Sequence, residues 1–435
     1  MSGASPSPLA RAVPLAHRTP SGLRVLVLPR PGAHRVALVT EIAVGSRYET
    51  PRENGISHLL EHMLYRGIPG HETAHEQALA FETLGGTLSA ATGTDGGSLA
   101  VSCPPETFAP TLELIARVFR EPLLGGLEVE KRIVREEILE DLDEDGALVD
   151  DHDLLRALAY GGHPLGQPVI GTAATVDRLD RDALLRHHAR HYVGRGAVIA
   201  IAGPVDPERI AREVERVFDG LAEGDELPIA PPPPQTAPRL SVVKSSASQT
   251  AIRLAFRGGG VRSADEPATE LLLRLLDDGN STRLYSRLCD ELGLAYDVSA
   301  GYDAAADTGL LDIACEAAHA TAPRVFEELL GVCVRLRDEG PSDAELGKAK
   351  SRSAWGLEEL LDDTAGLAEF HADAASRGYP ASLAERRAQL DGVSRDEVRA
   401  VAEKLLRPEN LSAVVVGLPA ARAQAQIRRL VAGFR

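Results

Sequence analysis

The chain has 435 residues, a formal net charge of −17 and four cysteines, and these values exclude several classes of protein. At roughly 100–200 residues per domain, this length predicts two large domains or a greater number of small ones. The negative charge argues against a nucleic-acid partner, because the phosphates would be repelled. The cysteines form no CxxC pair, so we expect neither a disulfide framework nor a cysteine zinc site.

The N-terminal region contains no signal that we read as a membrane segment or a secretion signal. No apolar run in the chain approaches the roughly 20 residues that a membrane helix needs, so we expect no membrane partner. The first forty residues lack Asp and Glu and contain several arginines, which superficially resembles a transit peptide. Residues 22–29, however, alternate as a strand does. We therefore expect the fold to begin there and the protein to be cytoplasmic.

A proline-rich segment divides the chain into two parts of similar length. Residues 231–234 are four consecutive prolines, which lack a backbone N–H and cannot join a sheet. The sequence therefore predicts an N-terminal domain at 15–222, an extended linker at 223–239 and a C-terminal domain at 240–435.

The two predicted domains show the same order of elements. Each begins with β-type alternation (35–44 and 240–256) and continues with helical periodicity (56–65 and 270–292), further strands (86–103 and 295–315), long helices (107–119 and 128–142; 322–338 and 343–361) and a closing apolar strand (197–202 and 411–416). A repeated order of this kind predicts a duplicated α+β unit, with antiparallel sheets and helices packed on one face of each.

The motif His58-Leu59-Leu60-Glu61-His62 is the strongest indication of chemistry in the chain. Residues i and i+4 share one face of a helix, so His58 and His62 can present two imidazoles to one metal ion. Glu61 would lie beside that pair, where it can take a proton from a water molecule. This is the H-x-x-E-H arrangement of inverted zinc peptidases.

A zinc hydrolase needs a third protein ligand, and the helical segment 128–140 offers carboxylates for it. Glu130 and Glu137 are seven residues apart and share a helix face. One could bind the metal while the other holds a ligand histidine. The spacing leaves open which does which, and it does not exclude Glu136.

A second motif competes with the first. Residues 71–75 read H-E-T-A-H and match the direct form HExxH. They follow Ile68-Pro69-Gly70, so this motif would have to open a helix, whereas apolar residues follow 58–62 and can brace it. We therefore favour His58 and His62 over His71 and His75.

The motif and its surroundings resemble the insulinase/pitrilysin (inverzincin) metallopeptidases, in particular the zinc-bearing subunit of the mitochondrial-processing-peptidase-like branch. The resemblance runs along nearly the whole chain. The similar segments are 21–25, 44–49, 55–67, 84–92, 163–166 and 408–417. It implies two homologous α+β domains and one zinc ion per chain.

The resemblance also assigns the carboxylates. In that family a glutamate ligand follows the second histidine at about the distance that separates Glu137 from His62, which is 75 residues here. By this resemblance Glu137 is the third metal ligand and Glu130 is the partner of a ligand histidine. Lys131-Arg132 departs by one position from the usual order of the family's helix.

Substrate in this family binds as an added strand at a sheet edge near the zinc, through main-chain hydrogen bonds. Ser89 and Ala91 replace a usual asparagine and a usual aromatic, which implies a roomier or differently selective pocket. The matching substrate-binding residues here are Gly86, Thr87, Leu88, Ser89, Ala90, Ala91 and Thr92.

The second half departs from the family at one position that bears on catalysis. Residues 281–285 and 293–296 resemble the segment whose arginine and tyrosine hold substrate and polarise the scissile carbonyl. Tyr296 is kept as a catalytic residue, but Cys289 stands where the arginine is expected. Arg287 is two residues away and would point elsewhere on a helix. Loss of such a donor costs orders of magnitude in rate, so we expect a partner chain to supply the pair.

The sequence therefore predicts a zinc endopeptidase in which Glu61 moves the proton. We expect it to act on unfolded peptides or peptide precursors as the catalytic subunit of a heterodimer with a paralogous chain. Removal of a leader from a ribosomally made peptide is one such reaction. The alternatives are a homodimeric general oligopeptidase that relies on Tyr296 and a non-catalytic scaffold subunit.

Overall fold

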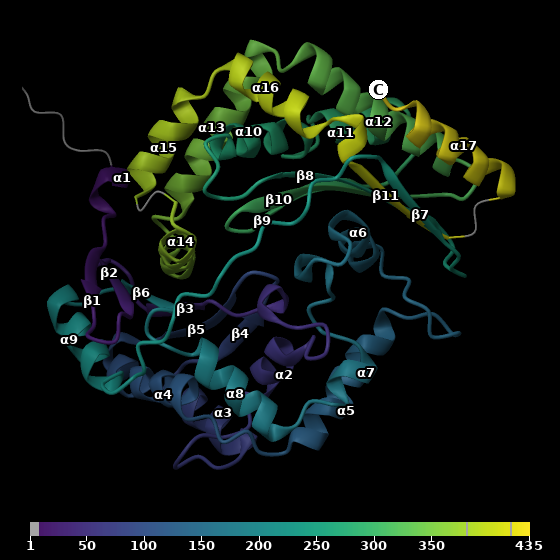
Figure 1. Ribbon diagram of the computed structural model, residues 1–435. Helices are drawn as coiled ribbons and strands as arrows, with labels where there is room; N and C mark the ends of the chain where they lie inside the picture. The colour runs from purple at the N-terminus through teal and green to yellow at the C-terminus, as the bar shows by residue number, and fades with distance from the viewer. Residues whose placement is uncertain (1–7, 380–381, 418–419) are drawn as a thin grey trace, which may run out of the picture. The chain divides into compact units, whose positions relative to one another are not determined.

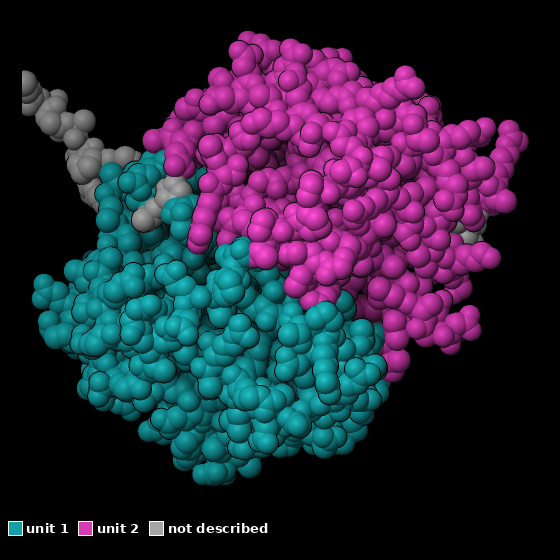
Figure 2. Space-filling view, in the orientation of Figure 1, with its two compact units in different colours: residues 1–138, 168–229, 356–386 teal, residues 139–167, 230–355, 387–435 magenta. Residues whose placement is uncertain are grey.

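The computed structural model describes residues 8–379, 382–417 and 420–435, which form two compact units (Figures 1 and 2). Unit 1 consists of residues 1–138, 168–229 and 356–386, and unit 2 of residues 139–167, 230–355 and 387–435. Each unit therefore contains one segment from the opposite half of the chain. Residues 221–238 form neither helix nor strand, and the boundaries that the sequence predicts around them stay a prediction.

Unit 1 is built on a six-stranded sheet in the order β1-β2-β6-β3-β5-β4. Neighbouring strands are antiparallel except β2 and β6, which run parallel. In the register of this sheet, Glu41 of β3 stands opposite Ser98 of β5 and Val198 of β6. The strands are β1 (Leu15–Arg18), β2 (Arg24–Pro29), β3 (Val36–Ile42), β4 (Ser89–Thr92), β5 (Gly97–Cys103) and β6 (Ala197–Gly203).

Helices cover both faces of this sheet. Helix α14 contacts β3 and β6, while α4 and α8 lie on the opposite face in Figure 1. Because both faces are covered, every residue of β6 is buried and the strand reads as a continuous apolar run. The helices are α1 (Pro8–Arg11), α2 (Ile56–Met63), α3 (Ala74–Thr83), α4 (Phe108–Arg120), α5 (Leu127–Glu140, its last two residues in unit 2), α7 (Ala173–Val176), α8 (Arg181–His191), α9 (Pro207–Val217) and α14 (Thr364–Arg377).

Unit 2 contains a five-stranded sheet in the order β7-β11-β8-β10-β9, in which β11 and β7 form a parallel pair. Its strands are β7 (Arg239–Val243), β8 (Thr250–Gly259), β9 (Val298–Ala304), β10 (Thr308–Ala317) and β11 (Leu411–Val416). Its helices are α6 (Asp151–Tyr160), α10 (Glu266–Leu276), α11 (Arg283–Tyr285), a π-helical turn (Ser286–Glu291), α12 (Ala322–Glu339), α13 (Asp343–Glu359), α15 (Leu383–Gly392), α16 (Arg395–Leu405) and α17 (Ala421–Gly433), with the end of α13 and the start of α15 in unit 1.

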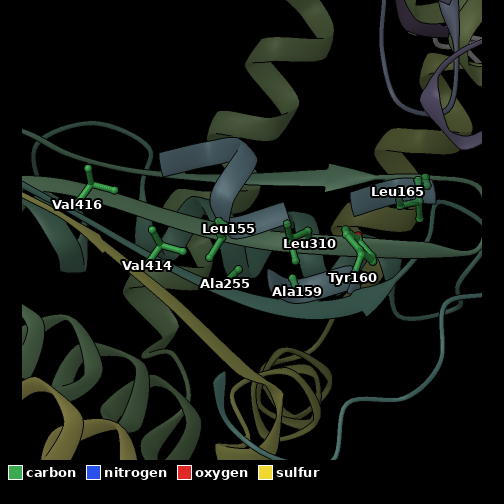
Figure 3. Close-up of a cluster of buried hydrophobic side chains, with 9 residues drawn as sticks. Leu155, Ala159, Tyr160, Leu165, Ala255, Leu310, Val414 and Val416 are labelled. Atoms are coloured by element: carbon green, nitrogen blue, oxygen red, sulfur yellow. The ribbon is translucent and has the colours of Figure 1, made fainter. Parts of the chain in front are cut away.

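Helix α6 comes from the first half of the chain and packs against the sheet of unit 2 (Figure 3). Its Leu155 and Tyr160 are 0% and 3% exposed and contact apolar side chains of three strands. The cluster consists of Leu155, Ala159, Tyr160, Leu165, Ala255, Ala305, Leu310, Val414 and Val416. In Figure 1, α6 and α12 lie on opposite faces of this sheet. Each sheet is thus closed on its second face by a helix from the other half of the chain.

The structure confirms the predicted α+β class with two sheets, and it places β3, β6 and β11 where the sequence predicts strands. The sheets are not purely antiparallel, because β2 and β6 and also β7 and β11 run parallel, and helices cover both faces of each sheet rather than one. The predicted continuous helical stretch at 270–292 is wrong, because α10 ends at Leu276. Gly279 has φ +92° within a run of turn-forming residues, which breaks the helix although buried leucines continue beyond it. In the described part of the chain, no helix has the length and apolar character needed to cross a membrane.

Truncation of Leu155 to alanine removes buried methyl groups from the contact between α6 and its sheet. We expect Leu155→Ala to lower the free energy of unfolding by about 2–5 kcal/mol, as measured by denaturant titration. The matched control is Leu139→Ala, since Leu139 is 57% exposed. The control is expected to change stability by less than about 0.5 kcal/mol. Equal effects of the two substitutions would contradict the packing described for α6.

Candidate metal centre

Helix α2 has one buried apolar face and one half-buried polar face. Ile56, Leu59, Leu60 and Met63 are at most 2% exposed, at the spacing of one helical face. Burial of these side chains fixes the rotation of the helix. His58, Glu61 and His62 consequently lie on a face that is half-buried.

Helix α5 brings a carboxylate to the two histidines. His58 Nε2 lies 3.7 Å from Glu137 Oε2, and His62 Nε2 lies 3.6 Å from Glu137 Oε1. The two imidazole rings are edge to face, with centroids 4.6 Å apart. One ligand atom of each of the three residues falls within 4.8 Å of the others. The structure therefore brings the three predicted ligands together.

The spacing and protonation of these groups fit a zinc ion. Zinc–ligand bonds of about 2.0–2.2 Å in a tetrahedron place the ligand atoms about 3.3–3.6 Å apart, close to the separations from Glu137. Burial, and then the neighbouring His62, lowers the pKa of His58 to about 4. The neutral imidazole is the form that binds metal. The residues present therefore match zinc in number and type.

Glu130 holds the second histidine from α5. Its Oε2 accepts a hydrogen bond from His62 Nδ1 at 3.0 Å, which leaves Nε2 free to bind a metal. Glu130 is 5% exposed and is also paired with Arg66. Arg66 was not among the predicted site residues, although its position four residues after His62 was a usable signal. The Arg66–Glu130–His62 contacts join the region of α2 to α5.

Glu61 faces the open edge of the unit 1 sheet. Burial raises the pKa of Glu61, and the hydrogen bond from the Thr92 side chain opposes that shift. Thr92 ends β4, which contacts α2 and pairs only with β5. The other main-chain edge of this strand is therefore unpaired by any strand of the described chain. Residues 86–88 precede β4 without regular structure.

The competing motif at 71–75 lies partly outside a helix. Helix α3 begins at Ala74, and Thr73 caps it together with Glu76. His71 instead forms an isolated bridge with Ile68. His71 and His75 are therefore not on successive turns of one helix. Neither of them belongs to the His–Glu group on α2 and α5.

The residues of the second half lie in unit 2. Tyr296 is 96% exposed, and Cys289 is on the π-helical turn. Arg287 donates hydrogen bonds to Glu328 and Glu291, both at 2.8 Å. Both carboxylates belong to unit 2, as Arg287 itself does. Arg287 therefore does not replace the arginine that the family resemblance leads us to expect at position 289.

Comparison with known proteins identifies relatives of both halves. Residues 24–173 match the family described as Insulinase (Peptidase family M16), and residues 178–353 match the Peptidase M16 inactive domain. An uncharacterized zinc protease of Mycobacterium tuberculosis strain H37Rv is 31% identical over 411 residues, which are 92% of each chain. An uncharacterized zinc protease of Bacillus subtilis is 27% identical over 399 residues, 91% of this chain and 96% of its own. The names of these relatives support a zinc-dependent protease function.

Solved structures share the fold. A protease from Helicobacter pylori superposes with a TM-score of 0.85 at 20% identity, over 93% of this chain and 99% of its own. A peptidase M16 inactive domain from Pseudomonas fluorescens also has a TM-score of 0.85, at 22% identity, over 93% of this chain and 97% of its own. At these sequence identities, the likeness establishes the fold alone.

Two buried histidines behind α2 contribute to the pH dependence of the stability of the metal-free chain. His187 and His191 of α8 are 9% and 1% exposed. Burial lowers the pKa of both, that of His191 to about 4. The pKa of a histidine in the unfolded chain is about 6.5. Between about pH 4 and pH 6.5, these histidines therefore bind more protons in the unfolded chain than in the folded one. The contribution of these two histidines to the free energy of unfolding therefore falls as the pH decreases through this window.

Denaturant unfolding of the metal-free chain at pH 7 and pH 5 measures this effect. We expect the change from pH 7 to pH 5 to be less unfavourable for the stability of His191→Gln than for that of the wild type, because the variant has no imidazole to protonate at this position. A pH dependence that the substitution leaves unchanged would show that His191 does not contribute.

Proposed function

Because the chain belongs to the insulinase family of peptidases (family M16), we propose that it is a zinc-dependent endopeptidase with its active site on α2 and α5. One observation carries this proposal: Glu137 lies within 3.7 Å of both His58 and His62. Glu61 lies on the same helix, next to His62 and hydrogen-bonded to the edge strand.

The residues of the site have separate tasks. His58, His62 and Glu137 would hold the zinc ion, and Glu130 would fix the orientation of His62. Zinc bound there supplies a water molecule of lowered pKa and polarises the scissile carbonyl. Glu61 takes the proton of the attacking water and passes it to the leaving amine. A raised pKa suits this role, because a base titrating nearer to neutral pH also makes an effective acid.

The substrate is proposed to bind along β4. Main-chain hydrogen bonds of an added strand recognise an extended peptide of almost any sequence, which favours unfolded peptides over folded proteins. Ser89 and Ala91 are exposed and small, and this supports a pocket that discriminates weakly. Glu61 reaches Thr92 at the end of the same strand, so a peptide bound there would pass the proposed base.

Substitution of the two candidate bases tests the proposal. Glu61→Gln keeps the shape of the side chain and removes the base, so we expect peptidase activity to fall by at least about 10²-fold. Glu72→Gln is the matched control, because Glu72 belongs to the motif outside a helix, and it should keep wild-type activity. Cleavage of a fluorogenic peptide by both purified variants measures the difference. Full activity of Glu61→Gln would overturn the assignment.

We also propose that a paralogous partner chain supplies an arginine and a tyrosine. Cys289 cannot donate as an arginine does, and Arg287 is bound to Glu328 and Glu291. Tyr296 is 96% exposed and is available to a second chain. A homodimer relying on Tyr296 is the alternative. A scaffold role is disfavoured, because the metal-binding and base residues are all present.

Activity with and without the partner distinguishes these assemblies. The chain alone is expected to cleave peptides slowly, and addition of a paralogue that carries the Arg/Tyr pair should raise kcat by about 10²–10³-fold. The homodimer alternative predicts instead that Cys289→Arg accelerates the isolated chain and that no partner has an effect. A fully active isolated wild-type chain would rule out the heterodimer. Processing of ribosomally made peptide precursors is the reaction that we propose for the assembled pair.

A further inference from the structure

The first turn of α2, which carries His58, cannot be capped by its own N-terminal residue. The N-cap Gly55 has φ +90°, and a Cβ there would lie 2.7 Å from the carbonyl oxygen of Ile170 and 2.9 Å from Cα of Gly171. A Ser, Thr or Asp cap therefore cannot occupy this position. The first N–H groups of the helix need an acceptor from elsewhere in the chain.

Ile56 N donates to Glu53 O at 3.0 Å. Glu49 is the acceptor for Ser57 N and for the N-cap Gly55. Its Oε2 accepts hydrogen bonds from Gly55 N at 2.8 Å and from Asn54 Nδ2 at 2.9 Å, and its Oε1 accepts from Ser57 N at 2.9 Å. The side chain is only 6% exposed. A buried carboxylate with three donors, placed at the positive end of a helix dipole, forms stronger hydrogen bonds than a neutral cap.

Ser57 connects this carboxylate to the core of unit 1. Its hydroxyl accepts a hydrogen bond from Gly45 N at 3.2 Å and lies 3.1 Å from His187 Nε2 of α8. Its backbone N–H is bound to Glu49. Ser57 is therefore held at two atoms, and the next residue in the chain is His58. Because Glu49 binds the backbone N–H of Ser57, it also fixes the backbone of the adjacent His58.

The two histidines differ in how their side chains are held. His62 donates Nδ1–H to Glu130, whereas Nδ1 of His58 is buried and has no hydrogen-bond partner in the described part of the chain. A metal-binding histidine usually has such a partner to fix its ring. His58 therefore depends more than His62 on where its helix turn is placed.

We propose that Glu49 is a positioning residue that holds the first turn of α2 so that His58 and His62 together meet Glu137. This inference rests on the proposed zinc site and assigns a role to a residue outside the H-x-x-E-H motif. Glu49 touches neither the metal ligands nor Glu61. Its effect passes through Gly55 and Ser57 to His58.

The substitution Glu49→Gln tests this role, because it keeps the shape of the side chain and replaces one acceptor oxygen by a donor. Both oxygens accept hydrogen bonds in the structure, so either orientation of the amide loses at least one. We expect zinc affinity, measured by chelator competition, to fall about 10–100-fold. We also expect an altered visible spectrum of the Co²⁺-loaded chain. Amide hydrogen exchange of residues 55–63 should accelerate in the metal-free chain.

Asn410→Ala is the control for a general loss of stability. Asn410 is 6% exposed and donates to Leu405 O and Arg257 O within unit 2. It should destabilise the chain without changing zinc affinity or the Co²⁺ spectrum. A wild-type affinity and spectrum in Glu49→Gln, or an equal loss of affinity in Asn410→Ala, would overturn the positioning role.

A second variant keeps the inference testable if Glu49→Gln does not fold. Ser57→Ala keeps the backbone N–H that binds Glu49 but removes the hydroxyl, which contacts Gly45 and His187 and also hydrogen-bonds the Glu49 side chain. It should weaken zinc binding in the same direction and by a smaller factor, and an unchanged affinity would contradict the inference. Failure of the wild-type chain to bind zinc would instead refute the proposed function. The two outcomes are therefore distinguishable.

Discussion

The contact between α2 and α5 is the interaction on which the site depends. His58 and His62 come from one helix, and Glu137 comes from another about 75 residues later. They meet because Glu130 binds both His62 and Arg66, and because Val134 and Ile138 of α5 are buried. The candidate metal-binding group is thus formed by two packed helices.

The exchange of helices between the halves of the chain supports this arrangement. Strands β3 and β6 are buried on both faces of their sheet, and α14 (residues 364–377) covers one of these two faces. The sheet of unit 2 is covered in the same way by α6. Neither half of the chain closes its own sheet. The six strands of the unit 1 sheet all come from residues 15–203, but one face of that sheet is covered by α14 from the C-terminal half.

The sequence predicted those features that depend on local patterns. The i, i+4 spacing of His58 and His62 and the shared face of Glu130 and Glu137 are helical periodicities, and the structure shows both. The resemblance decided between the two glutamates. The apolar pattern does not predict the end of α10 at Leu276. Buried leucines continue beyond this residue, and their spacing gives no information about the turn between them.

The remaining features follow from contacts between residues distant in sequence. The apolar periodicity of a helix indicates which of its faces is buried. It does not indicate which of the two sheets α6 or α14 covers. The role of Glu49 depends on Gly171 lying against Gly55, which leaves no room for a capping side chain at position 55. Such contacts are set by tertiary packing, and a single sequence carries no direct trace of them.

X-ray absorption at the zinc edge of the metal-loaded chain identifies the atoms that bind the ion. If α2 and α5 hold the metal, we expect two imidazole nitrogens and oxygen ligands at about 2.0–2.2 Å, without sulfur, and a change of this coordination in Glu137→Gln. A shell that contains sulfur, or one that is identical in wild type and Glu137→Gln, would contradict the assignment of the metal centre to α2 and α5.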